Sequence, residues 1–233
     1  YLIGKKLVSK DLGLVAALLL SINPLHIYYS QEARMYALAA FAVSVNVLLL
    51  IKVIKEEKVN LIFLIISNLN VLLSDYIAYF IFPAQLIFLY LLKKNEILKK
   101  WIAALASALV IGLIWLPVFL AQLDTGATAS SKLPTWKLIA GSFDFKTIPL
   151  TFVKFIIGRI SLVDKIIYAA VLLPVGSLFA YLLWRGQKEL SGFPKNLLIT
   201  WVVIPPLIAT VISIVVPVYS YFRVLFLLPA FVI

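Results

Sequence analysis

The feature that most constrains this chain is a series of long apolar segments separated by short loops rich in lysine and arginine. Most segments approach about 20 residues, the length that crosses the hydrocarbon core of a bilayer as a helix. They are continuous apolar runs rather than alternating strands of about ten residues, which favours helices over a membrane barrel. We therefore predict an all-α, polytopic transmembrane helical bundle with about seven spans and a truncated eighth. The spans are expected at about residues 12–27, 36–51, 59–73, 77–92, 101–123, 166–184, 197–216 and 224–233.

The composition also indicates a membrane protein. Hydrophobic residues make up 64% of the 233 residues and charged residues 13%, and the mean hydropathy is +1.08. A soluble domain is about half apolar and about a quarter charged, so a soluble fold would expose much of this apolar surface to water. The chain has no cysteine, which excludes disulfides, thiolate catalysis and thiolate metal ligands. It has no glycine-rich nucleotide loop, and we expect no cofactor.

The positive charge is distributed as in a multi-pass membrane protein. The net charge is +11, and the proposed cytoplasmic loops hold 13 of the 21 Lys and Arg residues. The short outer loops hold only Arg34 and Arg223, and long loops count little in this rule. We therefore interpret the charge as a topology signal, with the lipid bilayer and not nucleic acid as its partner. The expected location is the cell membrane, with the active face outside the cytoplasm.

We expect residues 1–233 to form part of one transmembrane domain with a long outer loop at about 124–165. Its first part, 125–131, is rich in small and hydroxyl residues and is predicted to be flexible. Its second part, 136–163, mixes aromatic, aliphatic and lysine residues and is predicted to include an amphipathic helix on the membrane. The last apolar run is about half a span long, and no signal segment precedes Tyr1. We interpret the chain as an internal piece of a larger membrane protein.

Prolines are expected to perturb three of the predicted spans, because proline lacks a backbone donor and clashes with the preceding helical turn. Pro24 lies near the end of the first span and Pro117 lies within the fifth. The seventh contains the pair Pro205 and Pro206. We predict a break or kink at each of these places.

A polar segment at 23–36 contains the only histidine, His26, together with Glu32 and Arg34. Ionisable groups at a membrane boundary are costly and are often functional. The planar donor fork of arginine suits phosphate, so we predict that Arg34 and Arg223 bind a phosphate or pyrophosphate, with Glu32 orienting Arg34 or acting as a base. Residues i and i+2 do not face each other on a helix, so an irregular backbone is expected there. Further residues expected to line the cavity are His26, Tyr29, Tyr36, Asp75, Tyr76 and Tyr221.

Each of these residues also has a structural interpretation. A lone Arg or Glu at the end of a span can anchor the helix at the interface, and tyrosines form the interfacial aromatic belt. Asp75 can cap a helix, and His26 can be a packed or hydrogen-bonded residue. One histidine with scattered carboxylates is a poor set of metal ligands, and we predict no metal site.

Residues 24–38 read PLHIYYSQEARMYAL and resemble a signature of the polytopic GT-C glycosyltransferases, specifically the bacterial and archaeal relatives of protein O-mannosyltransferases and the aminoarabinose transferases. Looser agreement comes from SDYIAYF at 74–80, WLPVFLAQ at 115–122 and YFRVLFLLP at 221–229. The resemblance implies transfer of a sugar from a polyprenyl-phosphate donor to a protein, lipid or glycan acceptor outside the cytoplasm, usually with inversion.

The resemblance also bears on individual residues. It places the acidic catalytic base on an outer loop before Tyr1, with Glu32 as the alternative base within this chain. It implies that Glu32 and Arg34 line the same cavity as that base. Many relatives carry a histidine at the position near Asp75, which implies a different contact with the donor sugar or the acceptor here.

Two other classes of function fit the composition. A transporter or flippase of lipid-linked sugars would use similar charges, but such proteins often show inverted repeats and midplane sites. This sequence shows no convincing repeat, and its charges lie at the ends of the predicted spans. A structural membrane subunit would explain the hydrophobicity but would give the outer arginines no role.

Overall fold

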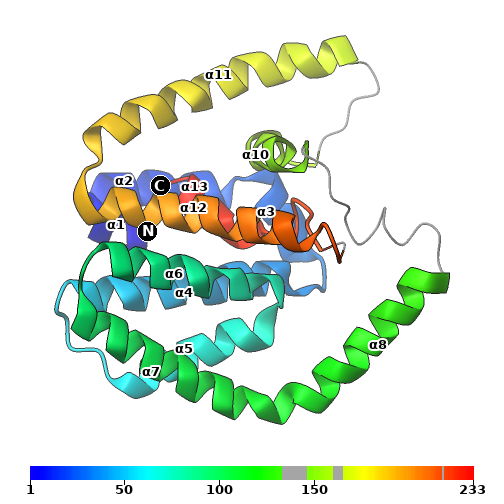
Figure 1. The fold of residues 1–233 in the computed structure, drawn as a ribbon. Helices are drawn as coiled ribbons and strands as arrows, with labels where there is room; N and C mark the ends of the chain where they lie inside the picture. The colour runs from blue at the N-terminus through cyan, green and yellow to red at the C-terminus, as the bar shows by residue number, and fades with distance from the viewer. Residues whose placement is uncertain (133–145, 160–164, 217) are drawn as a thin grey trace.

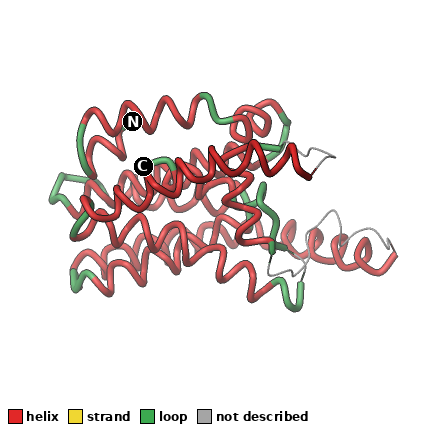
Figure 2. The backbone as a smooth tube through the Cα atoms, turned by 90° about the horizontal axis from the view of Figure 1, so that it is seen from above, coloured by secondary structure: helices red, strands yellow, loops and turns green. Residues whose placement is uncertain are grey.

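The computed structural model describes residues 1–132, 146–159, 165–216 and 218–233. Within these ranges the chain is all-helical, and no described residue lies in a strand. Figure 1 shows a bundle of roughly aligned helices, with α8 extending away from it at the lower right and α11 crossing above it. Seen from above in Figure 2, short loops join most of the helices. The helices are α1 (Leu2–Leu7), α2 (Lys10–Ser21), α3 (Pro24–Gln31), α4 (Met35–Ile54), α5 (Leu61–Ser74), α6 (Ile81–Leu91), α7 (Asn95–Gly112), α8 (Leu116–Lys132), α10 (Thr147–Ile157), α11 (Lys165–Glu189), α12 (Gly192–Ile212) and α13 (Leu228–Phe231), with 3₁₀ turns η1 (Ile77–Phe80), η2 (Leu113–Trp115) and η3 (Leu225–Leu227).

Several of these helices can cross a membrane. Four are long and apolar enough: α4, the stretch Asn95–Ala129, the stretch Ile166–Gly186 and α12. A fifth span results if α2 and α3, which meet at 58°, together form one. At a rise of about 1.5 Å per residue, the 14-residue α5 covers roughly 21 Å of a hydrocarbon core of roughly 30 Å. The all-α class is confirmed and a multi-pass membrane protein fits, but seven spans are not confirmed.

The prolines act differently from one another. α2 ends at Ser21 and α3 begins at Pro24, so the predicted break is confirmed. The η2 turn interrupts the helix just before Pro117, where a kink was predicted. By contrast, α12 continues through Pro205 and Pro206, so the helix does not break at this pair. Membrane helices tolerate proline where side chains and neighbouring helices satisfy the freed backbone groups.

The segment at 125–131 is helical, which corrects the prediction of a flexible loop. α8 runs from Leu116 to Lys132 and therefore includes Asp124 and these residues. The hydroxyls of Thr125 and Ser131 donate to carbonyls of the preceding turn, at 2.9 Å each, and so stay compatible with a helix. α10 supplies a helix within the predicted 136–163 segment. Residues 136–145 and 160–163 of that segment lie outside the described residues.

A buried polar network joins four helices at the centre of the bundle. The Asn46 amide of α4 donates to Ser67 Oγ and Asn68 Oδ1 of α5, at 3.1 and 2.7 Å. Gln85 of α6 donates to Asn46 Oδ1 at 2.7 Å, and the Trp101 indole of α7 donates to Gln85 Oε1 at 3.2 Å. Hydrogen bonds between buried side chains specify which helix faces meet. The network therefore holds α4, α5, α6 and α7 in fixed positions relative to one another.

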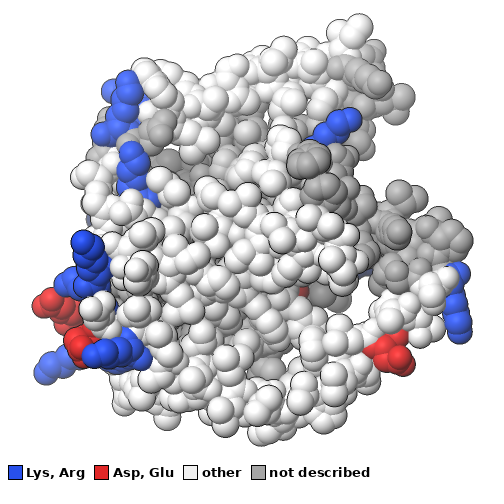
Figure 3. Space-filling model, viewed as in Figure 1, with Lys and Arg blue, Asp and Glu red and all other residues white. Residues whose placement is uncertain are grey.

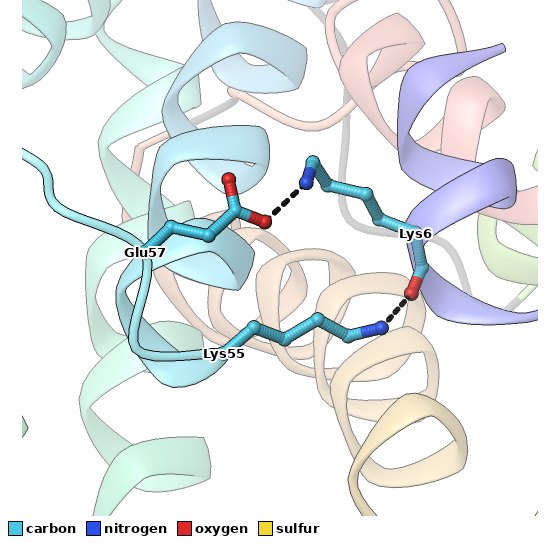
Figure 4. A network of polar contacts seen from close by, with 3 residues as sticks. All are labelled: Lys6, Lys55 and Glu57. Atoms are coloured by element: carbon cyan, nitrogen blue, oxygen red, sulfur yellow. Dashed lines mark hydrogen bonds and ion pairs between the residues drawn. The ribbon is translucent and has the colours of Figure 1, made fainter.

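Charged side chains gather at one end of the bundle. Figure 3 shows lysine and arginine concentrated at the left edge, over the loops that join the helices there. At this end the Lys6 ammonium pairs with the Glu57 carboxylate, and Lys55 donates to the Lys6 carbonyl (Figure 4). These contacts tie α1 to the loop after α4. Lys55 and Arg34 flank opposite ends of α4, so the lysine-rich loops and the predicted site lie about 30 Å apart.

Close packing of α1 against α2 depends on glycine. A Cβ atom on Gly13 would lie 2.6 Å from the Tyr1 carbonyl oxygen and 2.8 Å from the Lys5 nitrogen. We expect Gly13→Ala to reduce the free energy of unfolding by about 1–3 kcal/mol, because backbone cannot move aside as a side chain can. The measurement is the thermal melting temperature in detergent. Gly126→Ala is the matched control, since its Cβ meets nothing within 4 Å; equal melting temperatures for the two variants would contradict the close packing.

Candidate functional site

The start of α3 is fixed by a single asparagine. The Asn23 side-chain oxygen accepts from the backbone N–H groups of Leu25 and His26, at 3.0 Å each, and so caps the helix. The amide nitrogen of the same side chain donates to the Phe155 carbonyl of α10 at 2.7 Å. Asn23 therefore caps α3 and also holds the end of α10 beside it.

The backbone after α3 is irregular, as predicted for Glu32 and Arg34. Glu32 has φ −75° and ψ 134°, and Arg34 has φ −130° and ψ 160°, both extended. This geometry brings Arg34 Nε to 3.6 Å from Glu32 Oε2, which a continuous helix would prevent. The Tyr36 hydroxyl and the Glu32 carboxylate beside Arg34 raise the pKa of its guanidinium. Arg34 therefore stays fully charged at the end of the bundle.

A second arginine, Arg159, reaches the same carboxylate from the end of α10. Its guanidinium donates to the Tyr28 hydroxyl, lies 4.6 Å from the centre of the Tyr28 ring and places Nη1 3.9 Å from Glu32 Oε1. Gly158 makes this approach possible, because its φ is +74° and a Cβ atom there would lie 2.8 Å from Pro24 Cβ. Sequence reasoning missed Arg159, because it grouped this residue with a long loop whose charges carry little weight. The sequence signal that could have indicated Arg159 is the glycine directly before it, at the end of an apolar segment.

An aromatic cluster lies beneath these charges. The ring centres of Tyr29 and Tyr36 lie 5.4 Å apart, those of Tyr36 and Phe222 lie 5.2 Å apart, and those of Tyr221 and Phe222 lie 5.3 Å apart. Tyr29 and Tyr36 are each only 4% exposed. The predicted cavity residues Tyr29, Tyr36 and Tyr221 therefore belong to one packed cluster, which joins the 23–36 segment to the segment after α12.

Asp75 and Arg223 form a separate, more buried group. Asp75 Oδ1 accepts from the Ile77 N–H at 3.0 Å at the start of η1, while Oδ2 is buried without a hydrogen-bond partner among the described residues. Within the described ranges, Arg223 Nε and Ser220 Oγ, in one turn of the chain, are also buried without partners. Burial raises the pKa of the Asp75 carboxyl, and the Ile77 N–H and the charge of Arg223 lower it. The charge of Arg223 thus acts on the Asp75 carboxylate, although the two described side chains form no ion pair within 4.0 Å.

The remaining predicted residues, Tyr76 and His26, make other contacts. The Tyr76 hydroxyl donates to Gln122 of α8 and accepts from the Trp115 indole at 3.3 Å, so Tyr76 ties the loop after α5 to α8. A cavity of about 170 Å³ adjoins it, lined by apolar side chains that include Leu72, Leu113 and Phe119. His26 is partly buried in α3. Among the described residues, no three His, Cys, Asp or Glu side chains lie together as a metal site.

The predicted site residues fall into two sets of contacts. Arg34 lies with Glu32 and Arg159, whereas Arg223 lies with Asp75. The Tyr36–Phe222 contact of the aromatic cluster joins these two sets, because Tyr36 lies two residues after Arg34 and Phe222 directly precedes Arg223. Comparison with protein-family models, with curated proteins and with solved structures gave no match for this chain. The function of this chain is therefore inferred from these residues and from the motif in residues 24–38.

Proposed function

We propose that this protein is a membrane glycosyltransferase that transfers a sugar from a polyprenyl-phosphate donor to a protein, lipid or glycan acceptor on the extracytoplasmic side. The observation that carries the proposal is the pairing of Glu32 with Arg34 and Arg159, at the end of α4 opposite the lysine-rich loops. Two guanidinium groups around one carboxylate leave a net positive charge beside apolar helices. That combination suits a ligand with a phosphate head and a hydrocarbon tail.

The proposed reaction uses the arginines to stabilise a leaving phosphate. An acceptor hydroxyl oxygen attacks the anomeric carbon, and the bond between that carbon and the phosphate oxygen breaks. The electron pair of the broken bond stays on the phosphate, and the hydroxyl proton passes to a carboxylate base. Positive groups placed where negative charge develops are usually the largest single contribution to such catalysis. In this scheme Arg34 binds the phosphate, and Glu32 positions Arg34 in the absence of ligand. Arg223, which lies near Asp75, contributes a second positive charge for the phosphate.

A transporter or flippase of lipid-linked sugars is the second candidate. The polar network around Asn46 favours it, because transporters place polar binding groups near the bilayer midplane. Most polar atoms of that network are bonded to one another, however, which leaves chiefly the Asn68 amide for a ligand. The network therefore supports helix packing better than it supports substrate binding.

The test is an assay of the intact protein reconstituted in vesicles with a labelled polyprenyl-phosphate sugar. We expect label in an acceptor, together with release of polyprenyl phosphate in equal amount. Movement of labelled donor across the bilayer without sugar transfer would overturn the enzyme and support the flippase.

A further inference from the structure

The Glu32 carboxylate lies between two guanidinium groups that hold it only loosely. Arg34 Nε approaches Oε2 at 3.6 Å, and Arg159 Nη1 approaches Oε1 at 3.9 Å. Both distances exceed those of a hydrogen bond, and Glu32 Oε2 is buried without a hydrogen-bond partner in the part of the chain that the structure describes. The Tyr28 hydroxyl also hydrogen-bonds the carboxylate, but neither guanidinium makes with it the bidentate contact that arginine forms with a well-matched anion.

We infer that Arg34 and Arg159 together form the receptor for a phosphate group, and that a bound phosphate replaces the Glu32 carboxylate between them. The identification of this phosphate with the polyprenyl-phosphate head group depends on the proposed function. The assignment moves the partner of Arg34 from Arg223 to Arg159, a residue that the sequence motif does not contain.

Charge and geometry both favour the exchange. Polyprenyl phosphate, the product of the proposed transfer, is a monoester with roughly −1.5 to −2 charges at pH 7 and three acceptor oxygens. Glu32 offers one charge and two oxygens, so this product competes with it most strongly, whereas the donor diester carries a single charge. The side chains of Arg34 and Arg159 are 60% and 52% exposed, so an external anion can reach both. Their approaches to opposite oxygens of Glu32 show that the two guanidinium groups can contact one small anion at once.

The position of Arg159 is also fixed in advance. The Tyr28 ring and hydroxyl hold its guanidinium, and the Asn23 bond to Phe155 and the close Gly158–Pro24 contact hold the end of α10. A receptor whose groups are already placed loses little conformational freedom on binding. Both guanidinium contacts of Glu32 are longer than a hydrogen bond, whereas Arg159 donates a hydrogen bond to the Tyr28 hydroxyl. We therefore expect the Glu32 side chain, and not that of Arg159, to move when phosphate binds.

The experiment measures binding of farnesyl phosphate, a short polyprenyl phosphate, to the intact protein in nanodiscs of uncharged lipid. We expect Arg159→Gln to weaken binding by about ten-fold or more, the effect of losing a charge-assisted hydrogen bond. We expect Glu32→Gln to tighten binding by about two-fold or more, because a competing negative charge is removed. Inorganic phosphate should show the same order of affinities, and farnesol, which lacks the phosphate, should bind all variants alike.

Arg185→Gln is the matched control, since Arg185 also donates to a tyrosine hydroxyl but lies near the end of α11; its affinity should equal that of the wild type. Binding by Arg159→Gln within two-fold of wild type would overturn the inference, and so would weaker binding by Glu32→Gln. The two proposals fail separately. Expected binding without any sugar transfer overturns the enzyme alone, whereas sugar transfer with unchanged Arg159→Gln binding overturns the receptor alone.

Discussion

Sugar transfer from a polyprenyl-phosphate donor should fall by roughly 100-fold or more in the Arg34→Ala variant, the usual effect of removing one group that stabilises developing negative charge. The guanidinium is placed by an extended backbone at 32–34 and stays charged beside Glu32 and the Tyr36 hydroxyl. The measurement is the initial rate of acceptor labelling at saturating and at limiting donor. A larger loss in kcat than in KM is expected, because the phosphate gains charge as the glycosidic bond breaks.

Stability provides the control for this variant. The Arg34 side chain is 60% exposed, so its removal should leave the melting temperature nearly unchanged. Arg34→Lys keeps the charge but loses the planar fork, and should recover only part of the rate. Activity of Arg34→Ala within a few-fold of wild type, at equal folded protein, would exclude a role in binding the phosphate.

Local features of the sequence predicted much of the fold. The apolar runs became helices because backbone groups in a hydrophobic setting must bond within the segment. The break at Pro24 and the irregular backbone at Glu32 followed from the geometry of proline and from i,i+2 spacing. Helix length was less predictable, since small and hydroxyl residues at 125–131 stayed helical where a loop was expected.

The parts that could not be predicted depend on contacts between distant segments. Arg159 reaches Glu32 only because Asn23 and Gly158 hold α10 against the start of α3. The bonds of Asn46 depend on which faces of α4, α5 and α6 meet, and a single sequence does not state this. The same is true of the electrostatic influence of Arg223 on Asp75. In the sequence, the two residues of such a contact each appear as a single polar residue within an apolar segment, with nothing to connect them.

Replacing Arg223 by alanine should reduce the free energy of unfolding by about 1–3 kcal/mol, because it leaves a buried carboxylate without its nearby positive charge. Asp75 is only 8% exposed, and burial already raises the pKa of its carboxyl while the charge of Arg223 lowers it. Without that charge the pKa rises further. The double variant Arg223→Ala/Asp75→Asn should recover most of the loss, since asparagine can still accept from the Ile77 N–H and carries no charge to bury.

The stability difference between Arg223→Ala and the wild type is expected to grow as the pH rises. A carboxyl whose pKa is raised on folding favours the folded state below its unfolded pKa, near 3.8, and that contribution is lost as the pH rises through the folded pKa. Arg223→Ala should therefore match the wild type most closely in acid and fall furthest below it at neutral pH. Thermal melting of wild type, both single variants and the double variant across this range tests the coupling as a double-mutant cycle. A loss of stability that is independent of pH, or that Asp75→Asn fails to recover, would show that Arg223 acts through packing and not through its charge on Asp75.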